Sequence, residues 1–542
     1  MFNYFISIIM EKKTSSNFFQ EIKTNFTSDA TSGFMVALLA LPLSLGIAAA
    51  SDFPNPLFGV LTAIIGGMVI APIMGAELTI KGPAAGLIVI VASAVAAFGG
   101  GEMGWQMTLG AIVVAGLVQV LFGLFKLGKL SDLFPITAVH GMLAAIGIII
   151  MSKQFHIAMG VNPINEEGKP LVEPLELISA IPHTFSQMLN NPVLQCALIV
   201  GLVSLVIVFT WPLIKHPVIK KIPMPLVVLL VSIPLGMALG LSQENKQLVK
   251  VGSFFATLGI HVNWGGLKQL GTFLQYVALF AIIGSLESLL TAKAVDILDP
   301  LKRKSNFNKD LISVGLGNTV AGMMGGLPMI SEVARSSSNV ANGGKTRWAN
   351  FYHGLILFIL VAFLSGIIEM IPKSALAALL IGVGYKLAHP KEFKQTLRIG
   401  REQLLVFVTT IVFTLAVDLL VGILAGMLME LGIQWLFKVE TKEMFKSKIE
   451  VQDLGNDRYR VLVNSAAVFT NFLQIKKHLD TLPLGKHVEI DLSKSKMVDH
   501  TVLENLHFFE NSYRNQGGHI HVVGLEDHMS LSGHELAVRV KR

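Results

Sequence analysis

Two interruptions of long apolar runs constrain the fold of this chain more than any other feature. The first covers residues 79–86 and contains Gly82-Pro83, and the second covers residues 325–336 and contains Pro328. Each places Gly and Pro, with unusual charge, where an apolar helix should continue. In a bilayer, broken backbone is tolerated only where it lines a cavity, and paired breaks in the two halves of a chain indicate a solute site. We therefore predict a membrane protein that moves a solute.

Composition supports this class. Hydrophobic residues make up 52% of the chain, charged residues only 15%, and the mean hydropathy is +0.62, which does not fit a soluble protein of this length. The single cysteine, Cys196, is expected to be a packed apolar residue and leaves no disulfide. The net charge of +7 comes from basic residues in short loops between apolar runs, which is typical of membrane orientation rather than nucleic-acid binding. The apolar residues 2–10 lack a basic leader, so we expect an interfacial segment and a cytoplasmic N-terminus.

Stretches of about 20 apolar residues predict fourteen membrane spans. The expected starts in the first half are Ser32, Phe58, Gly82, Gln106, Thr137, Val193 and Met224. Those in the second half are Gly271, Asp310, Ser331, Ala349, Ser374, Glu402 and Gly422. With the N-terminus inside, most Lys and Arg residues fall in predicted cytoplasmic loops, as the positive-inside rule requires.

An odd number of spans in each half places the halves in opposite orientations, as inverted repeats. Gly82-Pro83 then opens the third span of the first half, and Ser331 opens the third span of the second half. Two half-helix N-termini are expected to face each other near the bilayer midplane. Each exposes unpaired N–H groups and a partial positive charge, so the arrangement favours an anion.

Charged residues inside spans are rare and usually face a cavity. Helical spacing places Gly284, Glu287 and Thr291 on one face of the first span of the second half. A carboxylate one turn from a hydroxyl can hold a sodium ion or carry a proton. The alternative is a structural ion pair of Glu287 with Lys81 or Arg335.

Lys81, Glu332 and Arg335 form a second charged group at the breaks. Arg335 is expected to attract the substrate, Lys81 to balance Glu287, and Glu332 to pair with Lys81. A helix N-terminus, where acidic residues are favoured, is an equally good explanation for Glu332. Pro42 lies mid-span and is expected to kink the first helix.

Several segments together resemble the SulP family of inorganic anion transporters. They are residues 29–50 with the Val-Ala-Leu-Leu-Ala-Leu-Pro core, the Gly82-Pro83 break, residues 284–296, residues 325–339 and the C-terminal region. The resemblance covers nearly the whole chain. It implies an all-α polytopic fold of fourteen spans in two inverted seven-span repeats, divided into core and gate domains, commonly as a homodimer. It also implies substrates such as sulfate, bicarbonate, chloride or small carboxylates, with sulfate as the first expectation, bound between the third and tenth spans.

The resemblance also implies site residues, with backbone donors expected around Ala84, Ala85, Ser331, Glu332 and Val333. The expected substrate-binding set is Leu43, Gly82, Pro83, Ala84, Ala85, Ser331, Glu332, Val333 and Arg335, and the coupling-ion set is Glu287, Thr291 and Ser331. Many family members have Gln where this chain has Leu43, polar residues at Ala84 and Ala85, and small residues at Lys81 and Glu332. Substrate identity therefore does not carry over, and proton and sodium coupling both stay open.

After Lys438 the sequence is richer in charged residues, and its apolar residues recur with strand spacing in some segments and helix spacing in others. Residues 459–463, 487–492 and 519–525 predict strands and residues 471–482 a helix, which together indicate a small α/β domain. It resembles a STAS domain, with Asp491 ending a strand and residues 497–501 opening a helix. The related anti-sigma-factor antagonists carry a phosphorylatable hydroxyl at the position of His500, which Thr501 could replace. A helix N-cap region in a dimerisation module is the favoured interpretation.

We therefore predict residues 1–30 as a cytoplasmic segment, 31–438 as the transport domain and 439–542 as a cytoplasmic STAS-like domain, in a bacterial inner membrane. The expected activity is cation-coupled symport of an inorganic anion by alternating access, without a cofactor. Alternatives are sodium- or proton-coupled bicarbonate or dicarboxylate transport, an exchanger or uniporter, and an anion-sensing scaffold that signals through the C-terminal domain. No GxxxxGK[ST] loop and no zinc-ligand spacing of histidines occurs in the sequence, so an enzyme is not expected.

Overall fold

The computed structural model of the chain describes residues 15–541 apart from 165–170, 172, 217–221, 302, 418 and 516. The expected interfacial segment at residues 2–10 lies outside this part. Two compact units are present. The first comprises the described residues up to Gly128 together with Ile146–Lys386, and the second comprises Lys129–Ala145 and the residues from Leu387 onward. The helix α6 (Ile136–Ala158) contributes to both units.

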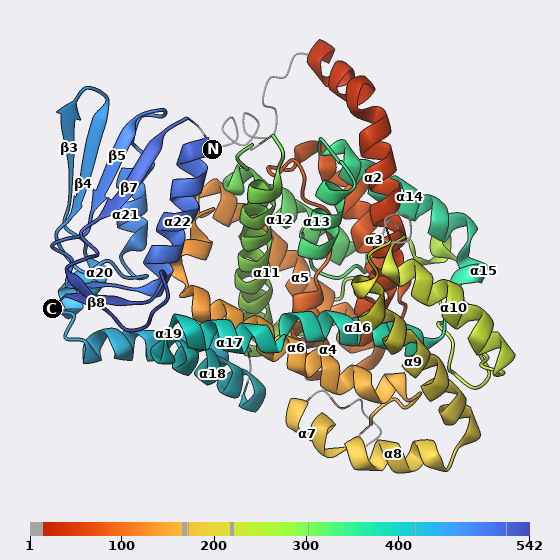
Figure 1. The fold of residues 1–542 in the computed structure, drawn as a ribbon. Coiled ribbons are helices and arrows are strands. Elements are labelled where there is room, and N and C mark those ends of the chain that lie inside the picture. The colour runs from red at the N-terminus through yellow and green to blue at the C-terminus, as the bar shows by residue number, and fades with distance from the viewer. Residues whose placement is uncertain are drawn as a thin grey trace. The chain divides into compact units, whose positions relative to one another are not determined.

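Helices make up most of the first unit (Figure 1). Its helices before residue 250 are α2 (Ser15–Ala50), α3 (Leu57–Ile64), α4 (Ile88–Ala97), α5 (Gly101–Leu124), α7 (Pro174–Ser179), α8 (Ile181–Leu189), α9 (Pro192–Thr210) and α10 (Met224–Ala238). Those after residue 250 are α11 (Leu270–Leu298), α12 (Phe307–Met323), α13 (Val333–Ala341), α14 (Trp348–Phe363), α15 (Ser365–Ile368) and α16 (Lys373–Leu387). Short helical turns are η1 (Ile65–Val69), η2 (Ala71–Ile73), η3 (Ala85–Leu87), η5 (Trp211–Leu213), η7 (Phe254–Thr257) and η8 (Trp264–Gln269).

A helix begins at or shortly after most of the predicted starts, but Gly82 and Ser331 themselves lie in extended backbone. The helices that follow them are short, with 10 residues in α4 and 9 in α13. The clearest boundary difference is α2, which begins at Ser15 rather than near Ser32. Its added N-terminal turns contain Gln20, Glu21 and Lys23, which are good helix formers, so a helix can continue beyond the apolar run. α2 also continues through Pro42 as one helix.

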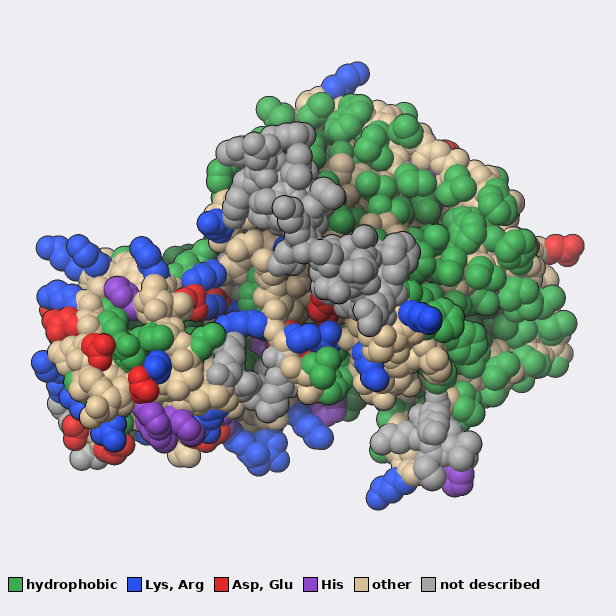
Figure 2. Space-filling view, turned by 90° about the horizontal axis from the view of Figure 1, so that it is seen from above, with side chains coloured by type: hydrophobic (Ala, Val, Ile, Leu, Met, Phe, Trp, Pro, Cys, Tyr) green, Lys and Arg blue, Asp and Glu red, His purple; other side chains and the backbone are tan. Residues whose placement is uncertain are grey.

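Both units contain helices that are suited to lipid. Six helices in the described part of the chain are long and apolar enough to cross a membrane: residues 22–50, 101–124, 136–158, 192–213, 264–296 and 419–436. Large exposed apolar side chains such as Leu202, Val206 and Leu230 cover α9 and α10, and Figure 2 shows hydrophobic side chains spread over the helical part. Cys196 lies on α9 and is partly exposed rather than fully packed, because α9 presents much of its apolar surface outward.

The second unit joins helices to a small α/β region. Its helical elements are η4 (Leu130–Leu133), α17 (Pro390–Ile399), α18 (Arg401–Ala416), α19 (Leu419–Leu436), α20 (Thr441–Phe445), α21 (Phe472–Leu479) and α22 (His500–Asn515). Its strands are β3 (Ile449–Gly455), β4 (Arg458–Val463), β5 (His487–Asp491), β6 (Met497–Val498), β7 (His519–Val523), β8 (His528–Ser530) and β9 (Arg539–Lys541). The strands predicted at residues 459–463, 487–492 and 519–525 and the helix predicted at residues 471–482 are confirmed, whereas β3, β6, β8 and β9 were not predicted. Residues 497–501 were expected to open a helix, but Met497–Val498 form the strand β6 and α22 begins only at His500.

The main sheet of this region has the order β3-β4-β5-β7. β3 pairs with β4 in the antiparallel sense, and β4, β5 and β7 pair in parallel. Its core contains Val461, Ile490 and Ile520 from the strands and Ile475 and Val502 from the helices. A second sheet has the order β6-β9-β8. The predicted small α/β region is therefore present.

The start of α22 is an N-cap rather than an open phosphorylation site. The Asp499 carboxylate accepts hydrogen bonds from the backbone N–H groups of Val502 (2.8 Å) and Phe469 (2.6 Å). The Thr501 side chain is buried, and its hydroxyl accepts a hydrogen bond from the N–H of Ile136. His500 is also buried and lies 3.1 Å from the Glu504 carboxylate. In this structure, neither Thr501 nor His500 is open to a kinase.

Asp499 makes stability depend on pH in a defined direction. Burial raises the pKa of its carboxyl to about 6. Because the folded-state pKa lies above the unfolded one, the folded state binds this proton more tightly, and its stabilising effect is lost as pH rises through 6. We predict that, as pH rises from about 5 to about 8, the free energy of unfolding of the wild type falls relative to that of Asp499→Asn by on the order of 1–3 kcal/mol. Apparent unfolding temperatures of the purified full chain across this range measure the difference. Asp527→Asn, at an exposed site, should track the wild type, and equal behaviour of the two variants would contradict the prediction.

Candidate anion site

The two helix interruptions meet as a short antiparallel ribbon. β1 (Lys81–Pro83) pairs with β2 (Met329–Ser331). The opposed residues are Lys81 with Ser331, Gly82 with Ile330, and Pro83 with Met329. Two further backbone bonds extend the ribbon: Ala84 N–H donates to the Pro328 carbonyl (3.1 Å), and Glu332 N–H donates to the Ile80 carbonyl (2.9 Å). The broken segments therefore support each other, and each leads directly into a helix, η3 with α4 on one side and α13 on the other.

This pairing changes the expected set of backbone donors. The N–H groups of Ala84 and Glu332 are used by the ribbon, and that of Ser331 donates to the Ser288 hydroxyl (3.1 Å). These three groups, expected to face an anion, are engaged with protein acceptors instead, because backbone at membrane depth must satisfy its own hydrogen bonds. Ala85 and Val333 begin η3 and α13, where N–H groups have no acceptor within the helix.

Lys81 has a different partner from the predicted ones. Its ammonium lies 2.7 and 2.8 Å from the two carboxylate oxygens of Asp310 on α12 and 2.6 Å from the Ser331 hydroxyl. The expected pairings of Lys81 with Glu287 and with Glu332 are therefore wrong. Lys81 is fully enclosed and Asp310 nearly so, and a buried charge needs a partner at this range. The pair joins the first break to α12.

Ser331 belongs to this network through its side chain. Its hydroxyl accepts from Lys81 and from the Ser288 hydroxyl (3.0 Å). We predict that Ser331→Ala lowers the free energy of unfolding by about 2 kcal/mol, because the Lys81 ammonium loses one acceptor. Ser313→Ala is the matched control, since that buried hydroxyl donates only to the carbonyl of Asp310 on its own helix. Thermal unfolding in detergent compares the two, and equal losses would show that Ser331 is not a special acceptor.

Glu287 lies beside the first break. Its side chain is buried on α11, and Oε1 has no hydrogen-bond partner in the described part of the chain. A Cβ added to Gly86 would come within 1.9 Å of this oxygen, so the carboxylate rests on the backbone just after the ribbon. Thr291 is buried one turn further along α11. The alternative that pairs Glu287 with Lys81 fails, since Lys81 is bound to Asp310.

Arg335 lies at the junction of the two breaks. Its side chain is completely buried, and Nη2 donates to the Ser44 hydroxyl of α2 (3.2 Å). Nε and Nη1 have no hydrogen-bond partner among the described residues. A Cβ added to Gly82 would lie 2.2 Å from Nη1, so the guanidinium from α13 packs on the backbone of β1. Burying a cation costs several kcal/mol unless its donors are satisfied, and two donors of Arg335 remain available to a ligand.

The other side chains predicted for the site are those of Glu332, Leu43 and Val333. The Glu332 side chain accepts from the backbone N–H of Arg335 (3.4 Å), which confirms the N-cap interpretation. Leu43 is half-buried on α2, next to Ser44. Val333 is 53% exposed. Sequence reasoning missed Ser44 and the role of Asp310. Their only signals were a hydroxyl one residue after Leu43 and a carboxylate at the start of an apolar helix.

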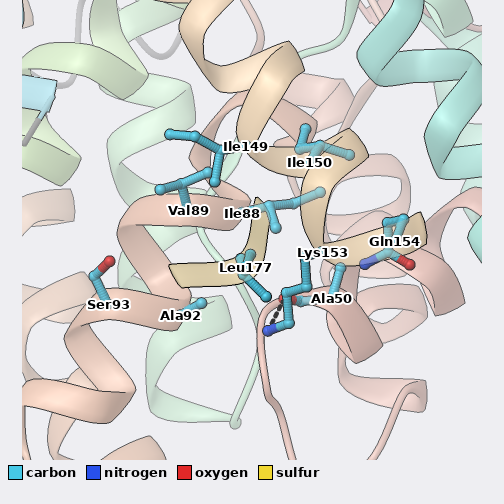
Figure 3. A pocket seen from close by; sticks show the side chains of 10 residues that line it. All are labelled: Ala50, Ile88, Val89, Ala92, Ser93, Ile149, Ile150, Lys153, Gln154 and Leu177. Atoms are coloured by element: carbon cyan, nitrogen blue, oxygen red, sulfur yellow. Dashed lines mark hydrogen bonds between the residues drawn. The ribbon is translucent and has the colours of Figure 1, made fainter. Parts of the chain in front are cut away.

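A separate hollow lies along α4 (Figure 3). Its lining is mostly apolar, from Ala50, Ile88, Ile149 and their neighbours. Its charged residue, Lys153, is 2.7 Å from the Asp52 carboxylate and donates to the Ala50 carbonyl (3.1 Å). Because this cation is already neutralised, the hollow does not compete with Arg335 as an anion site.

Comparison with known proteins gives the same class. A family model described as the sulfate permease family matches residues 26–410. The chain belongs to the sulfate permease family. The putative sulfate transporter YvdB of Bacillus subtilis is 26% identical over 410 residues, which cover 74% of this chain and 72% of YvdB. The bicarbonate transporter BicA of Picosynechococcus sp. is 24% identical over 410 residues, covering 74% of this chain and 69% of BicA.

The fold is also similar to that of a solved structure. The structure of SLC26A9 superposes on this one with a TM-score of 0.67 at 14% sequence identity, over 96% of this chain and 88% of the SLC26A9 chain. This agreement shows the fold. Membership of the sulfate permease family makes the chain an integral membrane protein of an anion-transporter family, which supports transport rather than enzymatic chemistry.

Proposed function

We propose that this protein is a secondary active transporter that takes up an inorganic oxyanion together with a cation. The observation that carries the proposal is the buried Arg335 guanidinium, whose Nε and Nη1 have no partner in the described structure. It comes from the first turn of α13 and packs on Gly82 of the first break. A buried positive side chain in the first turn of a helix favours an anion.

The proposed transport cycle is alternating access in a fold of fourteen spans. The fourteen helices would form two inverted seven-span repeats, with a core domain that carries the anion past a gate domain. We expect a homodimer in a bacterial inner membrane with both termini cytoplasmic. The relatives named as sulfate and bicarbonate transporters make these two oxyanions the first candidates.

Coupling is assigned to Glu287 and Thr291. Within the described part of the chain Glu287 Oε1 has no hydrogen-bond partner, and this oxygen and the Thr291 hydroxyl one turn away fit either a proton or a sodium ion. The carboxylate rests against Gly86, next to the anion position, so a bound cation would offset the charge of the anion. This proximity is the physical reason to expect symport rather than channel-like flux.

Uptake by proteoliposomes tests the proposal. The purified full chain is reconstituted, and entry of labelled sulfate and labelled bicarbonate is measured under a proton gradient, a sodium gradient or neither. Accumulation above the external concentration under one gradient supports symport. Equal entry in all conditions would indicate a uniporter, entry only against a loaded internal anion an exchanger, and binding without entry a sensing scaffold.

A further inference from the structure

Buried polar side chains join three helices of the second unit at one point. Helices α18 and α19 lie side by side (Figure 1). Gln403 on α18 accepts a hydrogen bond from the Thr137 hydroxyl at the start of α6 (2.6 Å), and its amide nitrogen lies 3.4 Å from both carboxylate oxygens of Glu430 on α19. All three side chains are almost completely buried and belong to the second unit. The Glu430 carboxyl is therefore enclosed between α6, α18 and α19.

The same contacts continue into the α/β region of that unit. One helical turn from Glu430, the Gln434 amide donates to the Asp499 carboxylate, which directly precedes α22 (3.3 Å). Two residues further along the chain, the Thr501 hydroxyl accepts from the backbone N–H of Ile136, the first residue of α6 (3.2 Å). The hydrogen bonds thus lead from α19 through α22 and α6 back to α19. We call this set the polar ring: Thr137, Gln403, Glu430, Gln434, Asp499 and Thr501.

The polar ring contains two buried carboxyl groups without a cation of their own. The titratable side chains that face it from α6, α18 and α22 are His140, Glu402, His500, Glu504 and His507. His500 is already engaged, because Nδ1 lies 3.0 Å from the Leu536 carbonyl and Nε2 lies 3.1 Å from the Glu504 carboxylate. Both of these partners accept, so both ring nitrogens carry protons, and Glu504 offsets the resulting charge. Among the described residues, no Lys or Arg forms an ion pair with Glu430 or Asp499.

Hydrogen bonds distinguish the two carboxyl groups. Asp499 accepts from two backbone N–H groups and from the Gln434 amide, and burial raises its pKa only to about 6, so it is ionised at neutral pH. Glu430 has a single amide at 3.4 Å, longer than a strong hydrogen bond, and its ionised form would be buried with little compensation. Gln434 Oε1 is a buried acceptor without a donor among the described residues. A proton on Glu430 supplies that donor one helical turn away.

We propose that Glu430 and Asp499 form a regulatory proton site, in which Glu430 holds a proton at neutral pH and donates a hydrogen bond to the Gln434 amide oxygen while Asp499 stays ionised. Loss of this proton places two negative charges in one buried contact, which weakens the attachment of α22 to α6 and α19. Attachment is therefore favoured at low pH and weakens as pH rises. Because α6 contributes to both units, this attachment acts on a helix that they share. The site is separate from Glu287, which belongs to the first unit, and goes beyond the proposed function.

Hydrogen exchange at the Ile136 amide measures the attachment. This N–H is the first of α6, so it has no acceptor within the helix and depends on Thr501. The purified full chain is labelled at about pH 7 and about pH 9, for times scaled to the intrinsic exchange rate at each pH. In the wild type, protection of Ile136 should fall at least about 10-fold at the higher pH. Glu430→Gln should keep it within about 3-fold, because an uncharged amide accepts from Gln403 and donates to Gln434 at both pH values.

Controls separate the proton site from a general effect of pH. Glu450→Gln, at an exposed position on β3, should lose protection as the wild type does. Thr501→Val should lose protection of Ile136 at both pH values, as expected if this amide measures the contact. Unchanged protection in the wild type, or a loss in Glu430→Gln equal to that of the wild type, overturns the proposal. If Glu430→Gln does not fold, the wild type still decides: a loss at Ile136 no larger than that at Ile490, in the core of the sheet, overturns it.

Discussion

Arg335→Gln is expected to abolish anion binding. The guanidinium is fully buried, touches Ser44 through one nitrogen and has no partner for Nε and Nη1 among the residues that the structure describes. An amide is neutral and cannot replace a charge-assisted contact in a dry site. Loss of one member of a buried charge pair costs several kcal/mol, so affinity for the transported anion should fall by at least about 100-fold. Anion-dependent thermal stabilisation and initial uptake rates in proteoliposomes both measure this loss.

Two other variants test whether the loss of anion affinity comes from the charge and shape of the Arg335 side chain. Arg335→Lys keeps the charge but loses the planar fork, so we expect intermediate affinity, reduced about 10-fold. Arg303→Gln removes an arginine that is already paired with Asp299 (2.7 Å) and should leave anion binding unchanged. If Arg335→Gln folds and binds anions within about 3-fold of the wild type, far short of the loss expected for a buried charge pair, the anion site lies elsewhere.

Glu287→Gln is expected to remove the coupling of anion uptake to a cation gradient. Glutamine fills nearly the same volume beside Gly86 but neither carries a proton nor binds sodium strongly. Accumulation under a proton or sodium gradient should fall to the passive limit, at which internal and external anion concentrations are equal. Exchange of labelled for unlabelled anion should continue, since Arg335 and the helix N-termini are intact. Parallel uptake and counterflow assays on the same vesicles separate these two activities.

The control for this variant is Glu102→Gln, in the first turn of α5, where the side chain is exposed. It should accumulate the anion as the wild type does. Full gradient-driven accumulation by Glu287→Gln would remove Glu287 from the coupling mechanism.

The helical framework was predictable because its signal is local. Apolar runs of membrane length identify helices such as α5, α9 and α19 without knowledge of their neighbours. The same holds for β5, whose residues favour a buried strand. The short helix α13, which follows the second break, was predicted from the Gly and Pro residues before it. The predicted start of α2 was wrong because residues with high helix propensity continue on the N-terminal side of the apolar run.

The contacts of the candidate site were much harder to predict. Lys81 was assigned to two carboxylates, yet it pairs with Asp310, a residue 229 positions away. Only the packing of α12 against the first break decides between these partners, and that packing is a long-range property. His353 was overlooked for a similar reason: a lone histidine in an apolar helix has no motif, and only the packed structure shows that it is fully buried with no hydrogen-bond partner for either ring nitrogen among the described residues.

The ribbon of β1 and β2 also sets the order in which the protein can be made. Lys81 pairs with Ser331, so the first break must wait until most of the helical region has been synthesised before its backbone groups find their partners. Contacts of such sequence separation form late and slowly. Until then, the polar residues of the first break must be shielded by water, lipid headgroups or the insertion machinery. The proposed anion site can therefore form only after Ser331 has been made, and a ribosome stalled before this residue would leave a nascent chain whose first break lacks its partner strand.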